Sequence, residues 1–207
     1  MKIGIICEGR LGGEDAQLFE HFAKRISPRA AVKAFPQGTK PELIEKAGDV
    51  AATLFATGYT RVLIMWDILP RWSRPGGEPE DTQDIEATLM AAGVNGHPCL
   101  FLIAIHKELE AWLLVDGSAL SKVLSRPAHP VVIPDNKKAD QEANPKKKLE
   151  KLFEMHNVPF GPQPSQGSYQ PKLAALRIAE QVPPNFGQLG KLNSFRKFGR
   201  ALTCCCT

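Results

Sequence analysis

Acidic residues follow three short apolar runs in this chain of 207 residues. The runs and their acids are Lys2–Cys7 with Glu8, Arg61–Trp66 with Asp67, and Cys99–Ile105 with Glu108 and Glu110. If the runs are neighbours in space, their carboxylates converge, and like charges held close together need a cation. Carboxylate oxygens are ligands that Mg²⁺ prefers. The sequence therefore predicts a magnesium site, with Mn²⁺ as the alternative ion, and chemistry on phosphate esters.

The three runs are typical of strands that are buried on both faces of a parallel sheet. Ligands of such sheets bind outside the carboxyl ends of the strands. The acids come directly after these ends, or a few residues beyond them. Glu108 and Glu110 are two residues apart on an expected helix, so they do not share a face. We expect at most one of them to face the site, and we choose Glu110.

Strands and helices alternate through the first half of the chain. Helical spacing of apolar residues is found between the runs, and Thr39 with Glu42 forms a capping-box pattern at the start of one helix. The alternation predicts an α/β fold, with a parallel four-stranded sheet and helices on both faces. We expect residues 1–116 to form this core. Residues 117–207 are expected to form a basic, mostly helical extension packed on it, with Val131–Ile133 as a candidate edge strand.

A glycine-rich turn follows the first run. Gly9 permits a tight turn close to a ligand, but the segment Gly9–Asp15 matches neither the Walker A pattern nor the dinucleotide-binding pattern. Glu14 and Asp15 open the next helix, where carboxylates interact favourably with the helix dipole. Capping and metal binding are both open as roles for these two acids.

Charge is distributed unevenly along the chain. Residues 1–116 carry 12 Lys/Arg and 16 Asp/Glu, whereas residues 117–207 carry 14 Lys/Arg and 6 Asp/Glu. A basic half next to an acidic half suits a metal site beside a surface that binds a polyanion, although solvated helix faces give the same pattern. The candidate nucleic-acid contacts are Lys146, Lys147, Lys148, Arg196, Lys197 and Arg200. Lys146 is also a candidate catalytic residue, as a cation that stabilises the scissile phosphate.

Several classes of protein are disfavoured by what the sequence lacks. No apolar stretch is long enough to span a membrane, and the first residues do not have the layout of a signal peptide. We therefore expect a cytoplasmic protein. No C-x-x-C pair supports a zinc site, and no G-x-S-x-G motif supports a serine hydrolase.

The chain resembles the Toprim fold of topoisomerases, primases and overcoming-lysogenization-defect nucleases, and more closely the DUF4276 family of bacterial Toprim-like proteins. The stretches that carry the resemblance are Ile6–Gly9, Trp66-Asp67 with Pro70, Glu108–Leu114 with Asp116, Asn144–Lys147 and Ser194–Phe198. The block E-L-E-A-W-L-L is fairly specific, whereas E-G alone is weak.

The resemblance implies a divalent-metal-dependent nuclease of a phage-defence system, in a family often found with ATPase partners of the AAA type. Glu8 then corresponds to the Toprim glutamate, and Asp67 to the first acid of the D-x-D pair. Leu69 stands where the family pattern has the second acid. The resemblance then implies that one metal position is weakened, or that it is filled instead by Glu110 or by Asp81 and Asp84.

Two other functions use the same residues. A degenerate Toprim-like module would bind an ATPase partner without catalysis. A phosphatase or nucleotidyl transferase would act on small phosphate esters with the same acids.

Overall fold

A computed structural model describes residues 1–69, 77–158 and 171–204, without the side chains of residues 171–173. Two compact units are found, one of Met1–Ile105 with Lys197–Thr207 and the other of His106–Arg196. This grouping differs from the expected division into 1–116 and 117–207, because the second unit begins after Ile105 and the last residues return to the first. Pro70, used in the family resemblance, lies outside the described residues.

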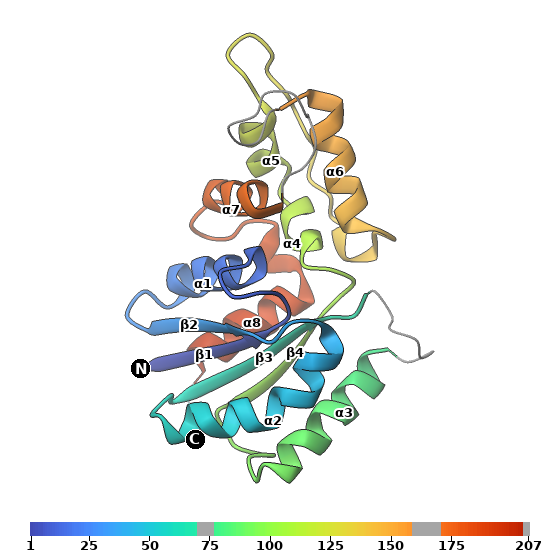
Figure 1. Ribbon diagram of the computed structural model, residues 1–207. Helices are drawn as coiled ribbons and strands as arrows, with labels where there is room; N and C mark the ends of the chain where they lie inside the picture. The colour runs from blue at the N-terminus through green and yellow to red at the C-terminus, as the bar shows by residue number, and fades with distance from the viewer. Residues whose placement is uncertain (70–76, 159–170, 205–207) are drawn as a thin grey trace. The chain divides into compact units, whose positions relative to one another are not determined.

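The first unit contains a sheet of four parallel strands, drawn as arrows in Figure 1. Its strands are β1 (Lys2–Cys7), β2 (Ala31–Pro36), β3 (Arg61–Asp67) and β4 (Leu100–Ile105), in the order β2-β1-β3-β4. β1 and β3 are the inner strands, and Cys7 lies opposite Met65 in their register. The predicted parallel α/β architecture is confirmed, and the carboxyl ends of the four strands share one edge.

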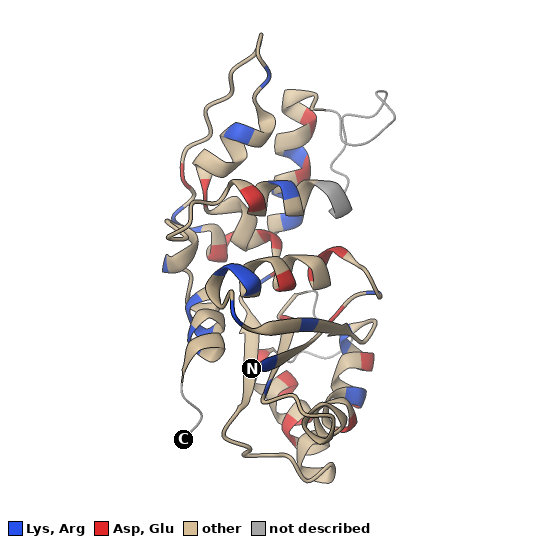
Figure 2. Ribbon diagram, turned by 90° about the vertical axis from the view of Figure 1, so that its left-hand side faces the viewer, with Lys and Arg blue, Asp and Glu red and all other residues tan. Residues whose placement is uncertain are grey.

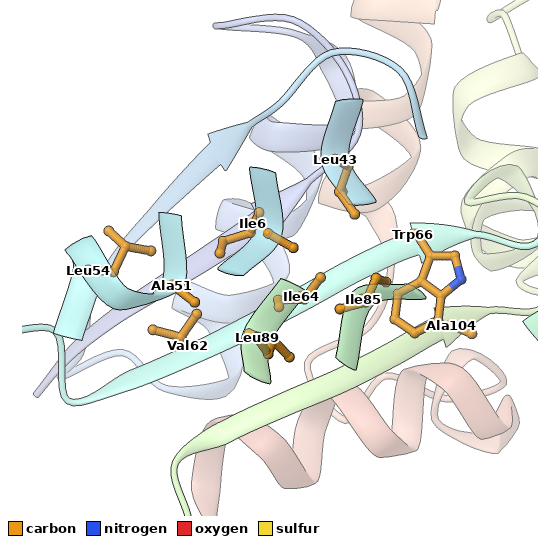
Figure 3. Packing of buried hydrophobic residues seen from close by; sticks show 11 residues of the cluster. Ile6, Leu43, Ala51, Leu54, Val62, Ile64, Trp66, Ile85, Leu89 and Ala104 are labelled. Carbon is orange, nitrogen blue, oxygen red and sulfur yellow. The ribbon is translucent and has the colours of Figure 1, made fainter. Parts of the chain in front are cut away.

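One face of the sheet is covered by α2 (Lys40–Ala56) and α3 (Glu78–Ala91). Figure 3 shows side chains from both helices meeting those of β1, β3 and β4 in one buried cluster. Its members include Ile6, Ile64 and Trp66 from the strands and Leu43 and Leu89 from the helices. Successive side chains of a strand point to opposite faces, so every second residue of the inner strands, such as Ile64 and Trp66, belongs to this face of the core.

α2 and α3 approach so closely that one position has room only for glycine. A Cβ atom at Gly48 would lie 2.1 Å from the carbonyl oxygen of Thr88. Because this oxygen is a backbone atom of α3, no side-chain movement can relieve the contact.

The opposite face of the sheet is covered by α1 (Glu14–Ile26) together with the last part of α8 (Asn193–Thr203). Phe19 and Phe22 of α1 are buried, and the ring of Phe19 lies 6.2 Å from that of Phe198. Arg61, at the start of β3, donates from its guanidinium to the carbonyl of Cys204. Helices on both faces of the sheet were expected and are present.

The second unit is mainly helical, as expected for the basic extension. It contains α4 (Glu110–Leu114), α5 (Gly117–Leu124), α6 (Pro145–His156), α7 (Pro171–Gln181), the first turn of α8, and 3-10 turns at Ala139–Gln141 and Leu189–Lys191. Trp112 is buried here and donates its indole N–H to Ser194 Oγ at 2.9 Å. Within the described ranges, no helix in either unit has both the length and the apolar character required to cross a bilayer.

The candidate edge strand at Val131–Ile133 is wrong. In the described chain this segment forms no strand; the nearest pairing is an isolated bridge between Arg126 and His129. Hydroxyl groups of α5 and of the residue after it bind the backbone of the segment instead. Ser125 Oγ accepts from the N–H of Val131 at 2.8 Å, and Ser121 Oγ accepts from the N–H of Ile133 at 2.8 Å. Side-chain hydroxyls thus satisfy backbone groups that we expected a sheet to satisfy.

Candidate functional site

Glu8 and Asp67 lie side by side at the carboxyl edge of the sheet. Asp67 is the last residue of β3, and Glu8 directly follows β1, the neighbouring strand. The backbone N–H of Asp67 donates to Oε1 of Glu8 at 3.0 Å. The structure therefore places the Glu8 carboxyl against the backbone of Asp67, another acid proposed from the sequence, while the role of both as metal ligands stays a prediction.

Two glycines connect this pair to the start of α2. Gly9 and Gly38 exchange backbone hydrogen bonds of 2.7 and 2.8 Å. Both have positive φ angles, +104° and +92°, which glycine adopts without strain. The turn after β1 is thereby fixed against the turn after β2, which places Glu8 near the first residues of α2.

The start of α2 is held by the predicted capping box. Glu42 Oε2 accepts from the backbone N–H of Thr39 at 2.7 Å and from its hydroxyl at 2.9 Å. These two hydrogen bonds to Thr39 lower the pKa of Glu42. The cap fixes the direction of the helix at its first residue, Lys40.

Lys40 is a buried cation at this edge, with only 3% of its surface exposed. Its Nζ donates to the carbonyl oxygen of Ile68 at 3.0 Å and lies 3.3 Å from Oδ2 of Asp81. Lys40 was not among the site residues expected from the sequence. The available indication was its place in the first turn of a helix, where the dipole disfavours a cation and an anionic partner is expected.

The Glu8 carboxyl is a weak acid in this setting. Its pKa is raised from 4.5 to about 7, mainly because burial disfavours the charged form. The hydrogen bond from Asp67 and the charge of Lys40 oppose this rise, whereas Asp15 and Asp81 add to it. At neutral pH the edge therefore holds a carboxyl group that is close to half ionised.

The buried thiol of Cys7 also responds to this concentration of acids. Its pKa is raised well above the ordinary value, first by burial and then by Asp15, Glu8, Glu20 and Asp67. Carboxylates of α1, of β3 and of the turn after β1 thus act on one buried position.

Glu14 and Asp15 form the first turn of α1, as expected. The Oδ2 atom of Asp15 lies 3.5 Å from the position that a Cβ of Gly9 would occupy. Asp15 is therefore close to the turn that carries Glu8. Gly13, the residue before the helix, has no side chain that could cap it, so both acids also balance the helix dipole.

The remaining predicted acid and the predicted lysines belong to the second unit. Glu110 is the first residue of α4, and Lys146, Lys147 and Lys148 are exposed in the first turn of α6. Glu108 accepts from the backbone N–H of Lys146 at 3.1 Å, so it caps α6. Lys148 is paired with Glu142. The approach of Glu110 and Lys146 to Glu8 and Asp67 stays a prediction.

The three basic residues of α8 are exposed. Arg196 lies 3.5 Å from the side-chain oxygen of Asn193, and Lys197 lies 3.8 Å from a carboxylate oxygen of Glu78. Arg200 is exposed on the following turn. Figure 2 shows that acidic and basic residues are mixed over the helices of both units. Basic side chains are therefore concentrated only in short segments, such as the first turn of α6.

The donor set at the edge suits a hard divalent cation in its chemistry. Glu8 and Asp67 offer carboxylate oxygens from adjacent strands, and Mg²⁺ is usually held by one or two carboxylates, with water and substrate phosphate completing its shell. In the described part of the chain, no group of three or more His, Cys, Asp or Glu side chains is arranged to hold a metal ion. Metal binding by Glu8 and Asp67 alone therefore stays a prediction.

A pocket of about 330 Å³ lies in the second unit. Its lining contains no carboxylate and none of the predicted site residues; it is formed by Leu124, Arg126, His129, Val131, Met155, His156 and Asn157.

No protein-family model, curated protein or solved structure matches this chain. The resemblance to the DUF4276 family accordingly stays a prediction, and the function must be argued from the edge of the sheet.

Proposed function

We propose that this protein is a Mg²⁺- or Mn²⁺-dependent nuclease that hydrolyses phosphodiester bonds, acting in the bacterial cytoplasm as part of a phage-defence system. The observation that supports it is the hydrogen bond from the backbone N–H of Asp67 to the Glu8 carboxyl, which places both residues at the carboxyl edge of a parallel sheet. This is the place where ligands of such sheets bind. Two neighbouring acids there favour a cation over an uncharged ligand.

In this proposal Glu8 and Asp67 hold the metal ion. The ion, when bound, polarises a phosphoryl oxygen and lowers the pKa of water, which is the chemistry that hydrolysis of a phosphodiester requires. Without the ion the pKa of Glu8 is about 7, so binding of the cation would release the proton that this carboxyl otherwise holds in part at neutral pH. Lys146 is the proposed phosphate-stabilising lysine, and the remaining basic residues of α6 and α8 are the proposed contacts to the nucleic-acid backbone.

The test is the substitution Asp67→Asn. It removes one anionic ligand while preserving the shape of the side chain, so we expect the loss of Mg²⁺-dependent cleavage with an unchanged melting profile. Asp49→Asn is the matched control, because Asp49 is an exposed acid of α2 in the same unit and this variant should cleave like the parent. Cleavage by Asp67→Asn at the parent rate would disprove the proposal.

The substrate is identified by parallel assays on DNA, RNA and mononucleotides. Metal-dependent cleavage of either polymer supports a nuclease. Turnover of a nucleoside monophosphate, with both polymers intact, would instead indicate a phosphatase or nucleotidyl transferase that uses the same two acids.

The second candidate function is a noncatalytic module that binds an AAA-type ATPase. It is favoured by the lack of a three-ligand group in the described ranges and by the presence of Lys40 among the acids. It predicts that an ATPase co-purifies with the chain, and that neither Mg²⁺ nor Mn²⁺ changes its thermal stability. A metal-dependent rise in melting temperature would argue against it.

A further inference from the structure

We infer that the ammonium group of Lys40 takes the place of a second divalent cation at the edge of the sheet, so that Asp81 is a partner of Lys40 and not a metal ligand. This inference deepens the proposed function and rests on it for the identity of the first ion. Lys40 is a positioning residue in this scheme.

The first step is the set of atoms that Lys40 engages. They are a backbone carbonyl oxygen, that of Ile68 at 3.0 Å, and a carboxylate oxygen, that of Asp81 at 3.3 Å. Both are hard oxygen donors of the kind that bind Mg²⁺. Ile68 directly follows Asp67, so this carbonyl lies next to the proposed ligand. A lysine therefore holds the oxygens that a second ion would require.

The second step is burial. The Lys40 side chain is 3% exposed and that of Asp81 is 16% exposed. Lysine is almost never buried to this extent without a paired anion, and a buried carboxylate is costly without a cation. The two charges consequently depend on one another. An Asp81 carboxylate committed to this pair is not available to replace the acid that is missing at Leu69.

The third step is the reach of the lysine charge. The ammonium group of Lys40 is fixed between the carbonyl oxygen of Ile68, the residue after Asp67, and the carboxylate of Asp81, so its charge lies at the same edge as the proposed metal ligands. Enzymes that hydrolyse phosphodiesters with two ions place them about 4 Å apart, and both ions share the work of neutralising charge. A fixed ammonium within the same group of acids performs that neutralisation permanently. The site then needs a single exchangeable ion.

The experiment counts bound Mn²⁺. We titrate MnCl₂ into the parent chain, Lys40→Gln and Lys46→Gln, and measure free Mn²⁺ by electron paramagnetic resonance. Glutamine removes the positive charge and leaves the oxygens of Ile68 and Asp81 available, so Lys40→Gln should bind one more Mn²⁺ per chain than the parent. Lys46→Gln is the matched control, an exposed lysine of the same helix, and should bind as the parent does.

The outcomes separate this inference from the proposed function. The same number of ions, or fewer, in Lys40→Gln would overturn the role of Lys40, as would two ions in the parent. No ion in the parent would overturn the proposed function, while an ion gained by Lys40→Gln would still support the role of Lys40. If Lys40→Gln is unfolded in metal-free buffer, we expect MnCl₂ to restore its circular dichroism spectrum; failure to do so also overturns the inference.

Discussion

The Glu8 carboxyl ionises near neutral pH because its burial raises the pKa more than the hydrogen bond from Asp67 lowers it. Removal from water raises its pKa, and the backbone N–H of Asp67 recovers only part of the cost. A carboxyl group at a strand end with full solvent access would ionise near 4.5. The folded protein therefore keeps Glu8 partly protonated at a cost in stability, which a bound cation would remove.

We predict that Glu8→Gln stabilises the folded protein at pH 8 but not at pH 4. Below pH 4.5 the Glu8 carboxyl is mostly protonated in both the folded and the unfolded protein. Its burial then costs no ionisation energy, and the stability of the folded protein is fully present. As the pH rises through about 7, the folded carboxyl must ionise in a poor environment, and this stability is lost. Glutamine avoids the loss, so we expect a gain of about 1–3 kcal/mol at pH 8. Urea unfolding at both pH values measures it.

The control for this prediction is Glu45→Gln, an exposed acid of α2. It should change the free energy of unfolding little at either pH. An equal loss of stability at both pH values in Glu8→Gln would mean that the carboxylate is required for folding, in contradiction to its raised pKa.

The positions of Glu8 and Asp67 could be predicted, but that of Lys40 could not. Each acid ends an apolar run, and the ends of adjacent parallel strands must share an edge. Lys40 instead contacts Ile68 and Asp81, which are 28 and 41 residues away in sequence. Nothing in the local spacing connects them, since only the packing of α2 and α3 on the sheet creates the contact.

At the scale of elements, the contact between α2 and α3 depends on a position without a side chain. A methyl group at Gly48 would meet the backbone of Thr88 at 2.1 Å, and this forces the helices apart. Because α3 carries Asp81 and α2 carries Lys40, their separation would also disturb that ion pair. The packing of α2 against α3 therefore also determines the geometry of the candidate site.

We predict that Gly48→Ala destabilises the protein by about 2 kcal/mol, although alanine has the higher helix propensity. Gly199→Ala is the matched control. Gly199 lies inside α8 with no atom within 4 Å of an added Cβ, so alanine there should stabilise by about 0.5–1 kcal/mol. Thermal melting of both variants decides the matter, and a stabilising Gly48→Ala would show that the helices are farther apart than described.

Some elements could not be predicted, because side chains that are distant in sequence bind the backbone of the segment. The four strands and the helices between them were predictable from apolar periodicity, and so was the cap formed by Thr39 and Glu42. Val131–Ile133 has the composition of a strand, yet hydroxyl groups of Ser121 and Ser125 hold it. Their effect depends on where α5 lies, which the sequence pattern does not specify.

For the whole molecule, the net charge of +4 is small and its local distribution matters more. Arg196 and Arg200 are exposed one turn apart on α8, which makes them candidates to contact successive phosphates. Lys197 has a weaker claim because it lies near Glu78. Binding of this kind releases counterions and so depends on salt concentration.

We predict that Arg196→Gln with Arg200→Gln weakens binding to single-stranded and double-stranded nucleic acid, regardless of sequence. For duplex DNA, the slope of log affinity against log salt should fall by about 0.9 for each phosphate that the variant no longer neutralises. The control with the same change in net charge is Arg29→Gln with Lys46→Gln, two exposed positions elsewhere. Equal reductions in affinity in both double variants, measured by fluorescence anisotropy at several salt concentrations, would assign the effect to overall charge.

The unit that carries Glu8 and Asp67 is built from two segments that are far apart in sequence. Phe198 packs near Phe19, and the carbonyl of Cys204 accepts from Arg61. On the ribosome, segments synthesised first usually fold first. Here the four strands emerge early, but the helix that covers one side of them is translated much later. One face of the nascent sheet therefore stays partly uncovered until about ninety further residues have been synthesised and α8 can pack on it.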